Sequence, residues 1–211
     1  MVALHEVVAQ HVAAIVGRGE QVVVASGDCM VALGVAAGLQ RAGVEPGIVW
    51  LDAHGDLQTL ETTPSGYLGG MPLSVLLGYR PELWGRPMGL RPFLEDDILL
   101  VGARDLDPSE AEYLRTSRIR RAAVEDPVAD HIASRPHLVH LDTDVVDPAE
   151  LTGQLFPTAN GAGKERVRQT VADVIGRASS VPALSVGLTS APERVATDPW
   201  YRHLLTGLME R

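Results

Sequence analysis

Two short apolar runs in this chain each end in a cluster of side chains that bind metals well. Asp52, His54 and Asp56 follow the first run, and Asp142 and Asp144 follow the second. Because side chains alternate across a strand, the first two members of each cluster are expected to share one strand face. Clustered carboxylates repel one another unless a cation neutralises them. The pattern therefore predicts a divalent-metal site, and its oxygen-rich ligands favour Mn²⁺ over a metal that prefers thiolates.

Apolar segments with strand and helix periodicity alternate along the chain. This alternation is typical of βαβ units and predicts an α/β fold with a mostly parallel sheet. No linker or internal repeat interrupts it, so residues 1–211 are expected to form a single domain. Ligands bind beyond the carboxyl ends of parallel strands, where both acidic clusters fall. The predicted helices are 2–16, 30–41, 72–77, 109–117, 164–178 and 200–209, and the predicted strands are 21–25, 48–51, 97–101, 118–124, 137–141 and 183–188.

Charge and cysteine content exclude several classes of protein. The 211 residues carry a formal net charge of −9. Nucleic acids and anionic membrane surfaces are bound through basic residues, so we expect neither as a partner. A single cysteine, Cys29, allows no internal disulfide and is typical of a reducing compartment. The first residues lack a signal-peptide pattern and no apolar stretch has membrane-spanning length, so we expect a cytoplasmic location.

Two loops are expected beside the acidic clusters. A long polar loop at 55–70 follows directly after a strand that carries ligands, which is typical of an active-site loop. Gly27, Asp28 and Cys29 follow another predicted strand and should lie at the same edge of the sheet. Asp28 is expected both to cap the next helix and to accept a hydrogen bond near the site.

Five motifs then follow one another along the chain. They are Gly27-Asp28-Cys29, DAHGD at 52–56, SGYLGGMP at 65–72, GARDLDP at 102–108 and DTDVVDP at 142–148. In this order they resemble the ureohydrolases, the superfamily of arginases and agmatinases. The similarity runs from about Val22 to the end of the chain. It implies an arginase-like, three-layer α/β/α fold with a binuclear manganese centre.

The resemblance also implies roles for the clustered residues. Asp52 and Asp142 would bridge the two metal ions. His54 and Asp144 would complete the ligands of one ion, and Asp56 would serve the other. Metal-activated water would attack the guanidinium carbon of the substrate and release urea. The catalytic residues would then be His54, Asp56 and Asp144.

Substrate contacts are implied for residues in two further loops. Gln58 and Ser65 stand where family members bind an amino-acid carboxylate. Asp107 and Glu110 stand where they contact the α-amino group. The resemblance implies a small guanidino compound as the substrate, and a homo-oligomer as the assembly.

Cys29, Gly69 and Thr189 depart from the pattern of the family. A histidine ligand is usual at the first position, a proton-transferring histidine at the second, and a glutamate that pairs with the guanidinium at the third. The first strand–helix unit of the family also has no counterpart in the chain. These changes favour a mononuclear or asymmetric centre, and a less basic substrate such as an N-hydroxyguanidine.

Cys29 and His140 each have more than one interpretation. Cys29 is a thiolate ligand, a nucleophile that attacks an amidine carbon, or a small inert core residue. His140 shares the strand face of Asp142 but lies deeper, so it is either a hydrogen-bond partner behind the metal ligands or a core histidine. The remaining histidines are not in phase with the acidic residues and are expected at the surface: His5, His11, His131, His137 and His203.

The resemblance thus predicts a manganese-dependent amidinohydrolase that cleaves a linear C–N bond in arginine, agmatine or an N-hydroxyarginine-like compound. The alternative is a catalytically reduced arginase-fold protein that keeps a metal for structure and acts as a partner subunit. The retained ligands favour the enzyme. The replacements at the three departing positions favour the alternative.

Overall fold

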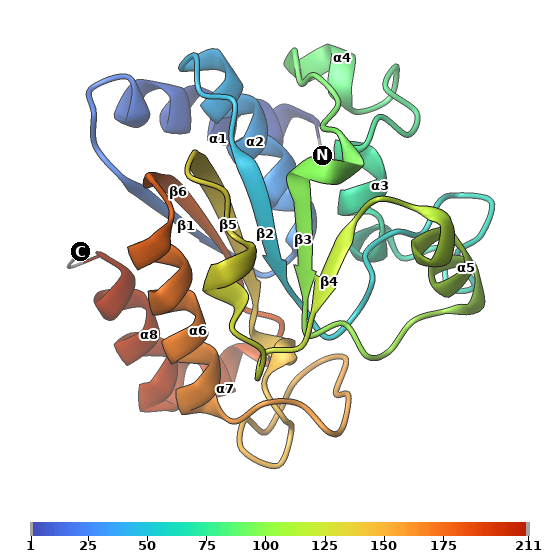
Figure 1. Ribbon diagram of the computed structural model, residues 1–211, viewed down its shortest axis with the longest axis vertical. Coiled ribbons are helices and arrows are strands. Elements are labelled where there is room, and N and C mark those ends of the chain that lie inside the picture. The colour runs from blue at the N-terminus through green and yellow to red at the C-terminus, as the bar shows by residue number, and fades with distance from the viewer. Residues whose placement is uncertain (1, 210–211) are drawn as a thin grey trace.

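The computed structural model describes residues 2–209, which contain one parallel sheet of six strands. The strand order is β1-β6-β5-β2-β3-β4. Figure 1 shows the sheet between two layers of helices, so the predicted three-layer α/β/α fold is confirmed. The ends of the predicted single domain, residues 1, 210 and 211, lie outside the described residues, and the domain assignment stays a prediction. The strands are β1 (Val22–Ser26), β2 (Gly47–Leu51), β3 (Ile98–Val101), β4 (Arg120–Ala122), β5 (Pro136–Asp142) and β6 (Ser180–Gly187).

Helices cover both faces of the sheet (Figure 1). The sheet separates two hydrophobic cores, one on each face. The helices are α1 (Val2–Val16), α2 (Ala32–Arg41), α3 (Pro72–Leu76), α4 (Gly85–Met88), α5 (Pro108–Thr116), α6 (Lys164–Arg177), α7 (Pro192–Thr197) and α8 (Pro199–Met209). Side chains of α1 to α5 pack with Trp50 and Leu100 on one face. Side chains of α6 and α8 pack with Leu51 and Leu141 on the other. Period-two alternation along the central strands therefore supplies both cores.

Short 3₁₀ helices connect several strands to the elements that follow them. They are η1 (Cys29–Val31), η2 (Leu68–Gly70), η3 (Glu95–Asp97), η4 (Val128–His131) and η5 (Thr143–Val145). The first of them leads into α2, which packs closely on α1. A Cβ at Gly38 would lie 2.6 Å from the Cβ of Val12, so the two helices approach at a distance that only glycine permits. This contact holds α2 against α1.

The predicted alternation of strands and helices is confirmed, with boundaries shifted by a few residues. Neither α4 nor α7 was predicted, because helices this short do not show a clear apolar periodicity. Asp97 was predicted to begin a strand but ends η3. No helix within residues 2–209 is both long and apolar enough to cross a membrane.

Two histidines predicted at the surface are buried. His5 is 1% exposed in α1, and His137 is 2% exposed in β5. The ring of His137 lies against Gly47, where a Cβ would come within 2.7 Å of its Nε2 atom. The prediction was wrong because a missing phase relation to the acidic residues does not reveal which other surface a side chain packs against. The other three, His11, His131 and His203, are exposed as predicted.

Candidate metal centre

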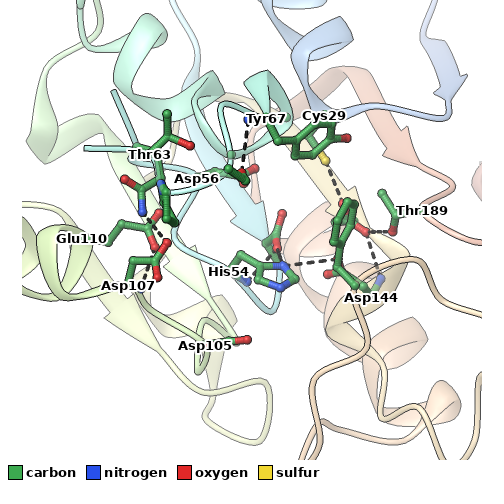
Figure 2. Close-up of a pocket in the computed structure, with 18 residues that line it drawn as sticks. Cys29, His54, Asp56, Thr63, Tyr67, Asp105, Asp107, Glu110, Asp144 and Thr189 are labelled. Atoms are coloured by element: carbon green, nitrogen blue, oxygen red, sulfur yellow. Dashed lines mark hydrogen bonds and ion pairs between the residues drawn. The ribbon is translucent and has the colours of Figure 1, made fainter. Parts of the chain in front are cut away.

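A pocket of about 270 Å³ opens at the carboxyl ends of the central strands (Figure 2). Its volume is near the lower limit for small-molecule sites. The pocket is lined by every residue predicted for the site from the sequence, and by the departing residues Gly69 and Thr189. The predicted residues are Cys29, Asp52, His54, Asp56, Gln58, Ser65, Asp107, Glu110, Asp142 and Asp144.

Strand register brings the two acidic clusters together. Leu51 of β2 pairs with Leu141 of β5, so Asp52 and Asp142 lie next to each other at the strand ends. Each of these aspartates accepts a hydrogen bond from a backbone N–H two residues later. The Oδ1 atom of Asp52 lies 2.7 Å from the His54 nitrogen, and that of Asp142 lies 2.9 Å from the Asp144 nitrogen. These turns direct both side chains of each cluster toward the pocket, as the period-two argument predicted.

Asp52, His54 and Asp144 form the first set of ligand atoms, which we term the His54 group. These atoms lie within 4.8 Å of one another. The Nδ1 atom of His54 is 3.2 Å from Asp52 Oδ1 and 3.3 Å from Asp144 Oδ2. Burial lowers the pKa of His54, but the hydrogen bonds that its ring donates to Asp144 and Asp52 outweigh burial and raise the pKa to about 11. The His54 side chain is 27% exposed, so this group borders the open part of the pocket.

Cys29, Asp52, His140 and Asp142 form a second set, which we term the Cys29 group. One ligand atom from each lies within 4.8 Å of the others, and all four residues are buried. The Cys29 thiol donates to Asp142 Oδ2 at 2.7 Å, and the Thr189 hydroxyl donates to Asp142 Oδ1. Burial raises the pKa of Cys29 well above its usual value, and Asp142 raises it further. Asp52 belongs to both groups.

His140 belongs to the Cys29 group and lies within β5, two residues before Asp142. Its ring stacks on Trp50, with centroids 3.7 Å apart and an interplanar angle of 24°. The Nδ1 atom lies 3.1 Å from Ser185 Oγ. The Nε2 atom is buried with no hydrogen-bond partner among residues 2–209. Burial lowers the pKa of His140 to about 3, which keeps the ring neutral.

The electrostatics of the cluster fit a divalent cation. Burial, followed by repulsion from Asp144, raises the pKa of Asp142 to about 8. Burial, followed by repulsion from Asp52, raises the pKa of Asp144 to about 6. Burial and repulsion from neighbouring carboxylates also raise the pKa values of Asp52 and Asp56. Within the described chain, the Oδ2 atoms of Asp52 and Asp56 are buried without a partner. Buried carboxylate oxygens are costly unless paired, and a bound cation pairs them.

Asp56 lies outside both groups but lines the same pocket. Its backbone is left-handed, with φ of 53°, and it is 4% exposed. The Asp56 carbonyl accepts a hydrogen bond from the Leu73 nitrogen at 3.0 Å, which ties the start of the loop at 55–70 to α3. The strain of this backbone is stored where the loop leaves the metal cluster, as is common at functional sites.

Asp107 and Glu110 lie at the end of the pocket away from Cys29 (Figure 2), and Gln58 contacts Asp107. The Gln58 amide donates to Asp107 Oδ2 at 2.6 Å. Both Glu110 carboxylate oxygens accept backbone hydrogen bonds at 3.0 Å, one from Leu57 and one from Asp107. Glu110 thus connects the loop at 55–70 to the start of α5. Asp107 and Gln58 line the pocket.

The ring of Tyr67 occupies the space into which a side chain at Gly69 would extend. A Cβ at Gly69 would lie 2.3 Å from the ring of Tyr67, which shows that this ring covers the position. The Tyr67 hydroxyl donates to Asp28 Oδ2 at 3.2 Å, while Asp28 Oδ1 caps η1, as predicted. The Tyr67 ring lies 5.2 Å from that of Phe156, which in turn meets His54 edge-on at 6.3 Å.

Sequence reasoning missed Tyr67 and Phe156. Both line the pocket although they are far apart in the chain. Aromatic residues make up only 4% of the sequence, and Tyr67 lies within the motif at 65–72. A rare residue type inside a motif is a signal that could have identified Tyr67. Ser65, by contrast, was predicted and is exposed at the rim, where its Oγ atom accepts from the Tyr67 nitrogen at 3.2 Å.

Comparison with known proteins agrees with this geometry. The family model described as "Arginase family" matches residues 2–183. This chain belongs to the arginase family. The predicted resemblance to the ureohydrolases is therefore confirmed. The arginase of Bacillus subtilis is 32% identical over 170 residues, which cover 74% of this chain and 57% of that protein.

Other arginase-family relatives differ in name and in coverage. The N(omega)-hydroxy-L-arginine amidinohydrolase of Streptomyces lavendulae is 36% identical over 135 residues, which cover 61% of this chain and 47% of that protein. Among solved structures, the arginase of Bacillus caldovelox superposes with a TM-score of 0.84 at 25% identity, covering 98% of this chain and 74% of that one. The chain thus spans less than two thirds of the length of these curated relatives, and 57% of the arginases of Bacillus subtilis and Bacillus caldovelox.

Proposed function

We propose that this chain is a metal-dependent amidinohydrolase that cleaves a C–N bond of a small guanidino compound. The products would be an amine and urea or a urea derivative. The observation that carries the proposal is the buried cluster of Asp52, Asp142 and Asp144 with His54 at the end of a small-molecule pocket. Unpaired carboxylate oxygens at this depth are explained by a cation. Membership in the arginase family supports the same reaction class.

The residues of both groups, with Asp56, would hold the metal, and Mn²⁺ suits the oxygen-rich His54 group. When bound, a divalent ion supplies the charge that lowers the pKa of water toward neutrality and yields a nucleophile. Asp52 and Asp144 hold His54 Nδ1 in place through contacts of 3.2 and 3.3 Å. Within residues 2–209, Asp56 Oδ2 has no hydrogen-bond partner, so it would accept the proton that the attacking water loses and return it to the leaving amine.

The opposite end of the pocket would bind the polar end of the substrate. Asp107 would accept from an ammonium group, with Gln58 and Ser65 available to a carboxylate. Glu110 would act by positioning the loop, since backbone N–H groups occupy both its oxygens. The rings of Tyr67 and Phe156 lie where a flat, cationic guanidinium would stack.

Thr189 bears on the choice of substrate. A carboxylate at this position would pair with a guanidinium, whereas the Thr189 hydroxyl instead donates to Asp142. An N-hydroxyguanidine is less basic than a guanidine, so it loses less binding free energy when no carboxylate is present at position 189. We therefore favour N-hydroxyguanidines over arginine or agmatine. The relative from Streptomyces lavendulae, an N(omega)-hydroxy-L-arginine amidinohydrolase, supports this choice.

One observation favours the second candidate function, a catalytically reduced protein that keeps its metal. Both oxygens of Asp142 accept hydrogen bonds from groups that replace the family's residues, Cys29 and Thr189. Such a protein would bind metal and a partner subunit without turnover. The predicted cytoplasmic location and homo-oligomer stay predictions.

A screen for the release of urea or, from the N-hydroxy compound, hydroxyurea separates these functions. The full chain, loaded with Mn²⁺ or Zn²⁺, would be assayed with arginine, agmatine, guanidinobutyrate and N-hydroxyarginine. We expect turnover that is fastest with N-hydroxyarginine and that is lost in Asp144→Asn. Bound metal without turnover of any compound would contradict the proposed activity and support the second candidate.

A further inference from the structure

His140 is a buried side chain with an unexplained nitrogen. It is fully buried in β5, and its Nε2 atom has no partner within the described residues. The other ring nitrogen, Nδ1, lies 3.1 Å from Ser185 Oγ. A core histidine in a satisfied environment would pair both nitrogens, because an unpaired buried polar atom costs free energy. The free lone pair of His140 is therefore an argument for a ligand.

The residues around His140 offer further ligand atoms. The thiol of Cys29, one carboxylate oxygen each of Asp52 and Asp142, and one ring nitrogen of His140 lie within 4.8 Å of one another. Because Nδ1 already faces Ser185 Oγ, Nε2 is the ring nitrogen that is available to a metal ion. Cys29 is 5% exposed and its neighbour in the hydrogen bond is a carboxylate, not an apolar side chain. Sulfur, nitrogen and two oxygens thus converge in one buried volume.

We propose that Cys29, His140, Asp52 and Asp142 form a mixed sulfur–nitrogen–oxygen metal site that selects Zn²⁺ or Co²⁺ over Mn²⁺. Thiolate and imidazole ligands suit zinc, whereas carboxylate sets suit manganese. The His54 group contains no sulfur, so the two groups differ in the ion they prefer. This inference rests on the proposed function, because it assigns the identity of one ion in the same centre.

Neighbouring residues prepare His140 for this role. A proton on Nδ1 directed at Ser185 Oγ leaves the Nε2 lone pair free, and such an outer hydrogen bond commonly fixes a metal-binding histidine. Stacking on Trp50 at 3.7 Å holds the ring plane. Cys29 would bind as the thiolate, releasing its proton to solvent.

Cobalt spectroscopy of the full chain tests the site without an activity assay. After removal of metals with a chelator, one equivalent of Co²⁺ is added and the near-ultraviolet spectrum is recorded. We expect a thiolate-to-cobalt charge-transfer band. The band should be absent in Cys29→Ser and present in the matched control His54→Gln, whose residue belongs only to the other group. Circular dichroism verifies that each variant is folded.

Competition between metals provides the second measurement. In an equimolar mixture of Zn²⁺ and Mn²⁺, elemental analysis of the wild-type chain should find zinc retained. His140→Phe keeps an aromatic ring against Trp50 but removes the ring nitrogens. Loss of a residue that only hydrogen-bonds a metal ligand already lowers metal affinity roughly tenfold, so the zinc affinity of this variant should fall by at least that factor.

The outcomes distinguish this inference from the proposed function. A wild-type chain that turns over guanidino compounds but shows no charge-transfer band overturns the inference alone. A band without turnover of any guanidino compound supports the inference and contradicts the proposed activity. Because the wild-type spectrum decides, a variant that fails to fold does not leave the inference untested.

Discussion

The His54 group and the Cys29 group share Asp52 but differ in depth and in chemistry. The His54 group borders the open pocket and keeps the acids and histidine that the sequence motifs predict. All four residues of the Cys29 group are buried, and there a thiol and His140 accompany the carboxylates. The two groups therefore offer different donor atoms within one pocket. This difference is the basis of the proposal that they hold different ions.

Asp52→Asn should have the largest effect, because Asp52 is the residue common to both groups. We expect a loss of metal affinity at both positions and a fall in turnover of at least about a hundredfold. Metal content and urea release measure these effects. Retention of either ion at wild-type affinity would break the idea of a shared ligand.

Metal-free protein should become less stable as the pH rises. The folded-state pKa values of Asp144 and Asp142 are raised to about 6 and about 8, above the unfolded value near 4. The folded state therefore holds more protons than the unfolded state in this range, and stability present below about pH 4 is lost as the pH rises through 8. We expect the Tm to fall by on the order of 5 °C between pH 5 and pH 8.

A matched variant and a metal titration sharpen this prediction. Asp142→Asn removes the group with the higher pKa and should flatten the slope. Added Zn²⁺ or Mn²⁺ should reverse it, because the ion binds the ionised carboxylates of the folded state. A Tm that is constant or rises over the same pH range would mean that the carboxylates do not repel one another.

Ser185→Ala acts on the Cys29 group alone. It removes the hydrogen bond at His140 Nδ1 without touching the His54 group. We expect a roughly tenfold loss of zinc affinity with manganese affinity unchanged. Isothermal titration with each ion measures the difference, and an equal loss for both ions would remove the distinction between the groups.

Phe156→Leu acts on the pocket side and should have the smallest effect. Its ring meets the rings of Tyr67 and His54, so the change removes a stacking surface but no ligand. We expect KM to rise by about threefold with little change in kcat, which corresponds to the lower range for a cation–π contact. The cobalt spectrum of this variant should equal that of the wild type.

Most of the fold and the metal-facing residues could be predicted from periodicity. Alternation along β2 and β5 placed Asp52 beside Asp142, and the rule for strand ends brought Cys29 to the same edge. These inferences use only local geometry and the parallel sheet. The family resemblance added the substrate loops, where Gln58 and Asp107 do face the pocket.

Other features depend on packing that no local pattern encodes. The burial of His5 and His137 depends on which neighbouring helix or strand covers them. The contact between Tyr67 and Phe156 joins two loops whose path only the folded chain defines. Likewise, both oxygens of Glu110 are used by backbone groups, one of which comes from a distant loop.

Anomalous diffraction from crystals grown with equimolar Zn²⁺ and Mn²⁺ would show which ion each group binds. Data collected on either side of each absorption edge identify the ion at each position. We expect zinc within bonding distance of Cys29 and His140, and manganese within bonding distance of His54 and Asp144, with Asp52 next to both. Anomalous maps without a peak beside Asp52 would contradict the claim that this buried cluster exists to hold divalent ions.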